Sequence, residues 1–218
     1  MQKTNNSACI SGVIAETFCY SHQIYGEKFY TSTVDVERKS GVIDSVPIMV
    51  SERLADVGSL LVGDGAVTDK WVGERVYIYG HFRSYNKHVG GQNHLILHLF
   101  ARGFFCIDNT EYDDNSIELD GFICKEPIYR KTPYGREICD ILLAVNRPYG
   151  KSDYIPCICW GRNARFASGL EVGTMLKVQG RIQSREYTKK LSETESETRT
   201  AYEVSLSRLG VVYDGEED

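Results

Sequence analysis

Polar and apolar residues alternate along much of the chain with a period of two, which is typical of β-strands. In the stretch that begins at Met175, the side chains of Leu176, Val178 and Ile182 fall on one face, and polar side chains fall on the other. The apolar face of such a strand packs on a core while the polar face meets solvent. The pattern predicts an all-β protein.

The chain also contains a long internal repeat. Gly12 aligns with Gly121 at an offset of 109 residues, and Val72–Ser84 aligns with Val172–Ser184 at an offset of 100. The larger offset also aligns Tyr25-Gly26 with Tyr134-Gly135, and Val46-Pro47 with Ile155-Pro156. Self-similarity at one long period indicates two domains of the same fold rather than a solenoid of short units.

Each copy is predicted to hold five strands, with one short helix after the third. In the second copy the strands are expected near Ile117–Pro127, Arg136–Arg147, Tyr154–Trp160, Thr174–Tyr187 and Thr200–Val212, and the helix near Arg162–Ser168. In the first copy the strands are expected near Ala8–Phe18, Glu27–Arg38, Ser45–Ser51, Glu74–Asn86 and Gln92–Phe105. This order is that of the OB-fold, a small Greek-key barrel, so two tandem OB-fold barrels are predicted.

The expected boundaries follow from composition. The first barrel is predicted over residues 1–108 and the second over residues 117–213, followed by a short acidic tail at 214–218, with the polar Asn109–Ser116 as linker. Thr132–Gly135 and Gly90–Asn93 have the composition of tight turns. Thr188–Arg199 has no apolar period and is expected to form a mobile loop.

Charge is unevenly distributed along the chain. The net charge is −5, but residues 117–190 carry thirteen basic and eight acidic side chains, whereas residues 1–116 carry ten basic and fourteen acidic ones. The local field, rather than the total charge, attracts a polyanion. A polyanionic partner would therefore meet the second copy.

Composition gives no sign of a membrane or secreted protein. No run of eighteen apolar residues occurs, and the N-terminal sequence lacks the apolar core of a signal peptide, so a cytoplasmic protein without membrane contact is expected. The seven cysteines form no C-x-x-C pair. Cys157 and Cys159 share one face of a strand, where buried, reduced thiols are favoured over a metal site or a disulfide.

No catalytic or cofactor motif stands out. A G-x-x-x-x-G-K-[ST] loop for nucleotide phosphates does not occur. His94 and His98 would lie about 13 Å apart along a strand, which is too far for both to bind one metal ion. The chain is therefore predicted not to be an enzyme and to need no cofactor or metal.

Aromatic and basic side chains share one face of the second copy. Tyr154 and Trp160 lie on the same side of their strand, with Pro156 and Ile158 between them. Proteins that bind single-stranded nucleic acid combine cations for phosphates with flat rings for bases. We call the following residues the aromatic–basic face: Tyr149, Tyr154, Trp160, Tyr187, Arg147, Lys177, Arg181 and Arg185.

These residues also have structural explanations. Trp160 could be a half-buried rim residue, because aromatic residues favour strands in general, and Tyr149 could be ordinary surface. Arg181 and Arg185 could pair with acidic neighbours, although the nearest in sequence, Glu186, points to the opposite side. The side that Trp160 shares with a second ring favours binding.

Three segments of the second copy follow one another between Leu119 and Tyr187: GFICKEPIYRKTPYGREICDILLAVNR, YIPCICWGRNA and the run V-x-G-R-I-Q-S-R-E-Y. In these segments the chain resembles the bacterial single-stranded-DNA-binding proteins. The resemblance implies four rings that stack on bases, and these fall on Tyr149, Tyr154, Trp160 and Tyr187. Tandem-barrel members of that family assemble as dimers, so a homodimer is implied as well.

The first copy lacks all four of these rings. The aligned positions are Ser40, Ser45, Ser51 and Lys87. Its fourth strand still has an outward row of polar and aromatic side chains, namely Tyr77, Tyr79, His81, Arg83 and Tyr85. This row could be a relocated binding surface, a dimer interface or a result of strand propensity, and an interface is favoured.

Three hypotheses about function remain open. The leading one is non-catalytic, largely sequence-independent binding of single-stranded DNA in replication, recombination or repair. The second is a protein-interaction module of a replication or primosome-type assembly, with replication or recombination proteins as partners and minor DNA contact. The third is binding of single-stranded RNA, because a stacking face does not itself read the 2′-hydroxyl.

Overall fold

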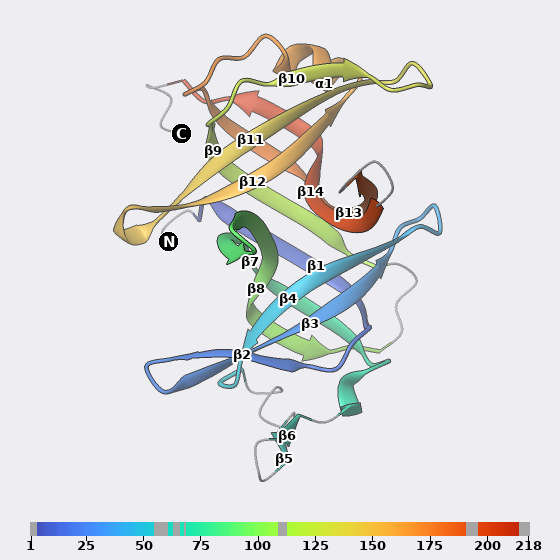
Figure 1. Ribbon diagram of the computed structural model, residues 1–218, viewed down its shortest axis with the longest axis vertical. Coiled ribbons are helices and arrows are strands. Elements are labelled where there is room, and N and C mark those ends of the chain that lie inside the picture. The colour runs from blue at the N-terminus through green and yellow to red at the C-terminus, as the bar shows by residue number, and fades with distance from the viewer. Residues whose placement is uncertain are drawn as a thin grey trace.

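Two closed β-barrels, joined by paired strands, make up the molecule (Figure 1). The computed structural model describes residues 4–54, 61–62, 66–67, 69–108, 113–190 and 196–213. Most of these residues lie in strands, and each half of the chain closes its own barrel. The fold is all-β with two tandem OB-fold barrels, as the sequence predicts.

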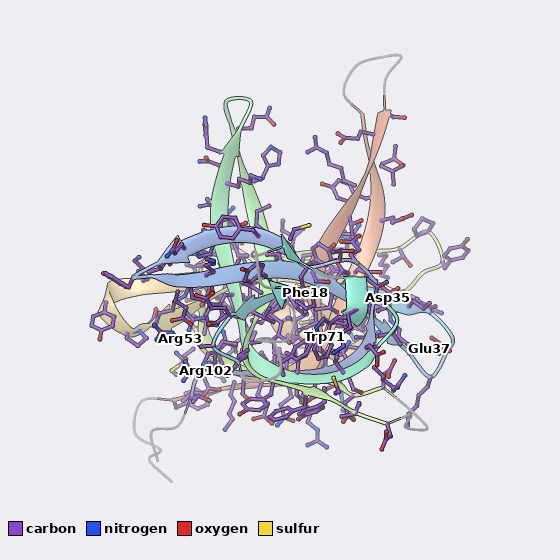
Figure 2. The ribbon with its side chains drawn as sticks, turned by 90° about the horizontal axis from the view of Figure 1, so that it is seen from below. Phe18, Asp35, Glu37, Arg53, Trp71 and Arg102 are labelled. Carbon is purple, nitrogen blue, oxygen red and sulfur yellow. The ribbon has the colours of Figure 1, made fainter. Side chains whose placement is uncertain are left out.

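The first barrel is built from six strands: β1 (Asn6–Ile14), β2 (Cys19–Ile24), β3 (Glu27–Glu37), β4 (Ile43–Ser51), β7 (Arg75–Val89) and β8 (Gln92–Cys106). The five long ones close in the order β1-β3-β4-β8-β7-β1, with β4 and β8 parallel. Between β4 and β7 lie a small hairpin of β5 (Leu61–Val62) and β6 (Ala66–Val67) and a 3-10 turn at Asp69–Trp71. Phe18 and Trp71, marked in Figure 2, both pack against Phe104 in the core of this barrel.

The second barrel repeats this plan. It comprises β9 (Asn115–Ile123), β10 (Ile128–Lys131), β11 (Glu137–Arg147), β12 (Lys151–Trp160), β13 (Met175–Lys190) and β14 (Ser196–Val211), with helix α1 (Arg162–Ala167) between β12 and β13. Its long strands close in the order β9-β11-β12-β14-β13-β9, with β12 and β14 parallel. The matching order and the placement of α1 agree with the sequence-based prediction for the second copy. The helix predicted after the third strand of the first copy is not found among the described residues, which hold the β5–β6 hairpin and the 3-10 turn there.

The predicted alternation is visible in the burial of the strands. Leu176, Val178 and Ile182 on β13 are at most 1% exposed, so the apolar face of this strand does face the core. Cys157 and Cys159 are buried and form no disulfide. Burial raises the pKa of the Cys159 thiol to about 12, which keeps it protonated at neutral pH.

The barrels join through their first strands. β1 and β9 pair antiparallel, with Asn6 opposite Leu119 and Ile10 opposite Asn115, so one sheet of twelve strands runs through both barrels. Asn6 and Asn115 occupy equivalent places in the repeat. The pairing therefore relates the two barrels by an approximate two-fold axis.

Two equivalent polar contacts also connect the barrels. In one, the buried carboxylate of Asp153 accepts a hydrogen bond of 2.6 Å from the Ser84 N–H; in the other, that of Asp44 accepts one of 2.8 Å from the Ser184 N–H. Each carboxylate also pairs with an arginine of its own barrel. We call these contacts the Asp153 clasp (Asp153, Arg147 and Ser84) and the Asp44 clasp (Asp44, Arg38 and Ser184).

The prediction of a mobile loop at Thr188–Arg199 is wrong for the residues that the structure describes. The β13–β14 ladder continues to Lys190 opposite Ser196, so this segment forms the end of a two-stranded arm, and residues 191–195 lie outside the described residues. The β7–β8 hairpin forms a similar arm, and the two arms project in the same direction (Figure 2). Both faces of such an arm meet solvent, so its sequence needs no apolar alternation.

The predicted turn is confirmed, whereas part of the predicted linker and the predicted tail lie outside the described residues. The predicted turn Thr132–Gly135 is confirmed by a 2.8 Å hydrogen bond from the Gly135 N–H to the Thr132 carbonyl, and it joins β10, a strand the sequence did not reveal, to β11. The expected linker Asn109–Ser116 is too long at its end, because Asn115 and Ser116 belong to β9 and pair with β1. Residues 109–112 of the linker and the expected tail, 214–218, lie outside the described residues. Over the described ranges, no helix is long and apolar enough to cross a membrane.

Candidate nucleic-acid interface

Strand β12 presents two rings of the aromatic–basic face. Tyr154 is 44% exposed and Trp160 is 38% exposed, while Ile155 and Cys159 on the opposite face are buried. The alternation of the strand thus produces the shared side that the sequence predicts. Ile158, between the two rings on the same side, is buried and lines the same hollow as Trp160.

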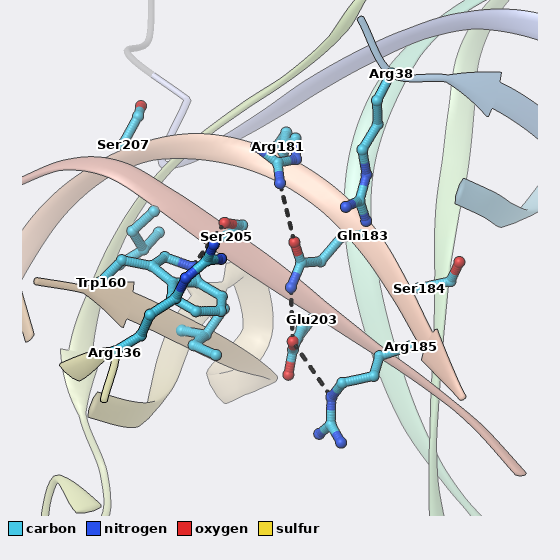
Figure 3. Close-up of a pocket in the computed structure, with 12 residues that line it drawn as sticks. Arg38, Arg136, Trp160, Arg181, Gln183, Ser184, Arg185, Glu203, Ser205 and Ser207 are labelled. Atoms are coloured by element: carbon cyan, nitrogen blue, oxygen red, sulfur yellow. Dashed lines mark hydrogen bonds and ion pairs between the residues drawn. The ribbon is translucent and has the colours of Figure 1, made fainter. Parts of the chain in front are cut away.

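Trp160 lies in a groove of about 520 Å³ on the second barrel (Figure 3). Its indole N–H donates a 3.2 Å hydrogen bond to the Ser205 hydroxyl on β14, which fixes one edge of the ring. Arginine side chains line the same groove, and they are Arg38, Arg136, Arg181 and Arg185. The groove therefore combines a held aromatic ring with several guanidinium groups.

Tyr187 lies on the β13 arm beyond this groove. It is 38% exposed, and the guanidinium carbon of Arg185 lies 6.0 Å from the centre of its ring. Arg185 has the acidic partner that its sequence neighbours did not supply, because its Nε lies 3.7 Å from Glu203 Oε1 on β14. The arginine side chain remains half-exposed, so the pair is a weak one.

Arg181 sits deeper in the groove. Its Nη2 donates to Gln183 Oε1 at 3.3 Å, and its buried Nε has no hydrogen-bond partner among the described residues. Burial lowers the pKa of this guanidinium, the positive charge of Arg38 lowers it further, and Asp44 opposes both. Arg181 therefore keeps unused hydrogen-bonding capacity at a cationic site.

Tyr149 and Lys177 lie apart from the groove. Tyr149 is 99% exposed at the turn between β11 and β12, with a positive φ of 67°. Lys177 is exposed on β13, paired in register with Asp120 of β9, and precedes the bulge between Gln179 and Gly180. These two predicted contacts extend the aromatic–basic face but do not line the groove around Trp160.

Arg147 has a different environment from the other predicted cations. Its Nε donates to Asp153 Oδ2 at 2.6 Å, and its Nη2 donates to the Ser84 carbonyl of the first barrel at 2.9 Å. The hydroxyl of Ser84 in turn accepts a 2.7 Å hydrogen bond from the N–H of Tyr154. The geometry makes Arg147 a link between the barrels that supports the backbone at Tyr154.

Sequence analysis did not identify Arg38 and Arg136 as members of the groove. Arg136 immediately precedes β11, and Arg38 comes from the first barrel. Arg38 aligns with Arg147 at the repeat offset of 109, and that alignment is the signal that could have found it. Its approach to the second barrel depends on the packing of the two barrels, which no local pattern encodes.

The outward row of the first barrel is divided by a β-bulge between Tyr79 and Gly80. Before the bulge, Tyr79 stacks on Phe105 with ring centres 6.1 Å apart. After it, the guanidinium of Arg83 lies over the Phe100 ring at 5.2 Å. The row thus contacts two different sets of neighbours, and its predicted role as an interface stays a prediction.

Histidines do not form a metal site in the described part of the chain. No group of three or more His, Cys, Asp or Glu side chains there could hold a metal ion. His98 is buried, and burial lowers its pKa to about 4.

The sequence of the second barrel is similar to that of known single-stranded-DNA-binding proteins. The single-strand binding protein family matches residues 114–211. Over 80 residues, or 34% of this chain, the sequence is 36% identical to the single-stranded DNA-binding protein of Halalkalibacterium halodurans and to single-stranded DNA-binding protein A of Bacillus subtilis. The matched region covers 48% and 46% of those two proteins, so the chain spans about half the length of the curated relatives it matches.

Among solved structures, the wild-type single-stranded DNA binding protein from Thermus aquaticus is similar over both barrels. The TM-score is 0.72 at 18% identity, and the match covers 98% of this chain and 95% of that one. At this identity the likeness shows the fold alone. It covers both barrels of this chain and nearly the whole length of that one.

Proposed function

We propose that this chain, whose residues 114–211 match the single-strand binding protein family, binds single-stranded DNA through its second barrel. The observation that carries the proposal is the set of half-exposed rings Tyr154, Trp160 and Tyr187 on the strands that border an arginine-lined groove. Each stacked base contributes about 1–3 kcal/mol whatever its identity. Such a face binds with little sequence preference.

The proposed contacts fall into three groups. Tyr149, Tyr154, Trp160 and Tyr187 stack on bases, while Arg181, Arg185 and Lys177 meet phosphates. Arg147 acts through the Asp153 clasp, by holding the strand that carries Tyr154. No catalytic step is part of this function, because coating a single strand requires positioning and charge but no bond-making.

The wider role follows from this activity. Proteins that coat single strands act wherever duplex DNA is opened, so we place the chain in replication, recombination or repair. A cytoplasmic location, a homodimer and contacts with replication or recombination proteins are further parts of the proposal that rest on the sequence.

Titration of a fluorescently labelled oligo-dT strand, followed by anisotropy at several salt concentrations, tests the proposal. Tight binding at low salt that weakens linearly with log salt is expected, with little binding to a duplex of the same length. An oligo-U strand titrated in parallel separates DNA from RNA binding. No anisotropy change with oligo-dT at low salt would contradict the proposal.

Variants separate the leading function from the alternative interaction module. The double substitution Trp160→Ala and Tyr187→Ala should abolish most of the binding. Tyr25→Ala is the matched control, because Tyr25 is a fully exposed ring at the β2–β3 turn of the first barrel. If the double variant binds oligo-dT as the wild type does, the stacking face is not the DNA site.

A further inference from the structure

Two arginines from different barrels meet beside the proposed DNA groove. Arg38 follows β3 in the first barrel, Arg181 lies on β13 of the second, and both line the groove that holds Trp160 (Figure 3). The same two side chains also line a second hollow of about 430 Å³, which continues to Lys39 and Ser40 of the first barrel. Arg38 and Arg181 therefore lie at the border between the groove and the second hollow.

Arg38 is held firmly in this position. Its Nε donates to Asp44 Oδ2 at 2.6 Å and its Nη2 to Asp44 Oδ1 at 2.5 Å, and the carboxylate itself is fully buried. Asp44 is also bound by the Ser184 N–H of the second barrel. A bidentate pair on a buried carboxylate fixes the guanidinium without removing its remaining donors.

The charges at this point are incompletely balanced. Four guanidinium groups line the groove, and the negative charges near them are the carboxylate of Glu203 and that of Asp44, which pairs with Arg38. Positive charge is therefore in excess. In the second hollow, Glu37 and Asp113 are the acidic residues, and Asp113 is already paired with Arg75. The buried Nε of Arg181 has no partner among the described residues. An anion with several acceptor oxygens would satisfy both arginines at once.

We propose that Arg38 and Arg181 together bind one backbone phosphate of the single strand, so that the strand passes from the groove of the second barrel toward Lys39 of the first. The proposal rests on the proposed function and adds a residue from the barrel that lacks the four rings. The DNA site is then a composite one, incomplete without the first barrel.

The equivalent place on the other side of the two-fold axis is built differently. There Arg147 takes the position of Arg38, and its Nη2 donor is used by the Ser84 carbonyl. His81 takes the position of Arg181, and its Nδ1 lies 2.7 Å from the Asn6 carbonyl oxygen. Arg147 therefore offers a matched control, because it pairs with an equivalent buried aspartate, Asp153, but has a histidine in place of Arg181 beside it.

The test compares Arg38→Gln with Arg147→Gln in the full chain, using oligo-dT affinity as a function of salt. One phosphate contact contributes about 0.7 to the slope of log K against log salt on a single strand. Arg38→Gln should weaken low-salt binding about tenfold and lower the slope measurably, by at most that amount because Arg181 still meets the phosphate. Arg147→Gln loosens the support of Tyr154 and can lower the affinity, but it removes no phosphate contact and should leave the slope unchanged. An unchanged slope in Arg38→Gln, or equal changes in both variants, would overturn the inference.

A double variant tests whether one phosphate is shared. If Arg38 and Arg181 hold the same phosphate, Arg38→Gln with Arg181→Gln should lose less binding than the product of the two single losses. Independent, multiplicative losses contradict a shared site. Should Arg38→Gln fail to fold because Asp44 is left buried and unpaired, Arg38→Gln combined with Asp44→Asn removes both charges and permits the same salt titration.

The outcomes also separate this inference from the proposed function. If the wild-type chain does not bind oligo-dT, the proposed function fails. If the wild type binds and the Arg38 variants retain its salt slope, only the shared phosphate site fails.

Discussion

Three side chains are expected to carry most of the binding energy. Tyr154, Trp160 and Tyr187 are each between 38% and 44% exposed, so their rings contribute little to the core. Substituting each by alanine should weaken oligo-dT binding about 5- to 150-fold, which corresponds to about 1–3 kcal/mol per stacked base. Thermal midpoints should stay close to that of the wild type.

The conservative exchange of Tyr187 provides the control for this prediction. Tyr187→Phe keeps the ring and loses the hydroxyl, so stacking should be retained. If phenylalanine costs as much binding as alanine, the side chain acts through its hydroxyl, and stacking is not its role.

One buried histidine makes stability sensitive to acid. Burial lowers the pKa of His98 to about 4 from its ordinary value of 6.5. The unfolded chain therefore binds more protons between these pH values, so stability should be complete above pH 6.5 and fall toward pH 4, by on the order of 3 kcal/mol. His98→Leu should flatten this part of the stability profile, measured by urea unfolding at several pH values.

His88 is the matched control for this experiment, because it is exposed at the end of β7. His88→Leu should leave the acid sensitivity intact. Equal pH profiles for wild type and His98→Leu would show that other groups, such as carboxylates, cause the acid sensitivity.

At the scale of the strand, a bulge in β13 depends on a missing side chain. A Cβ on Gly180 would collide with the carbonyl oxygen of Ser205 and lie 3.0 Å from its carbon, whereas a Cβ on Gly210 would meet no atom within 4 Å. Gly180→Ala should therefore destabilise the protein by about 1–3 kcal/mol, the usual cost of overpacking.

Gly210→Ala lies on the neighbouring strand β14 and should be close to neutral. Thermal or urea unfolding of both variants compares them directly. If both are equally stable, the close approach at the bulge can relax without cost, and the bulge does not require glycine.

The long strands could be predicted from the sequence because each buries one face. Leu176 and Val178 on β13 alternate with polar residues, and such alternation indicates both the strand and its inward side. The short strands β2 and β10 and the outer part of the β13–β14 arm left no such signal. Their side chains are mostly exposed on both faces, so neither face needed to be apolar.

At the scale of the whole molecule, the repeat in the sequence revealed two barrels but not their contact. Asp44 and Asp153 read as ordinary polar residues, yet each lies buried and binds a serine N–H more than sixty positions away. The predicted rings follow from local alternation, whereas the contribution of Arg38 to the groove depends on how the barrels pack. Local patterns therefore predict the stacking rings better than the cations around them.

The oligomeric state of the protein can be predicted and measured as a molar mass. A homodimer would give a molar mass about twice the 24.6 kDa of one chain in light scattering. Tyr79 and Phe105 form an exposed aromatic pair on the shared sheet, and this pair is the surface on which to test the expected interface. If the protein has the mass of a single chain at all concentrations, the predicted homodimer is wrong.

The central claim, that bases stack on the second barrel, is tested most directly by tryptophan fluorescence during titration with oligo-dT. The chain has two tryptophans: Trp71 is 5% exposed in the first barrel, and Trp160 is 38% exposed in the groove. The account predicts saturable, salt-sensitive quenching in the wild type that disappears in Trp160→Phe, where Trp71 remains as an internal reference. Emission that does not change at low salt, or equal quenching in Trp160→Phe, would contradict it.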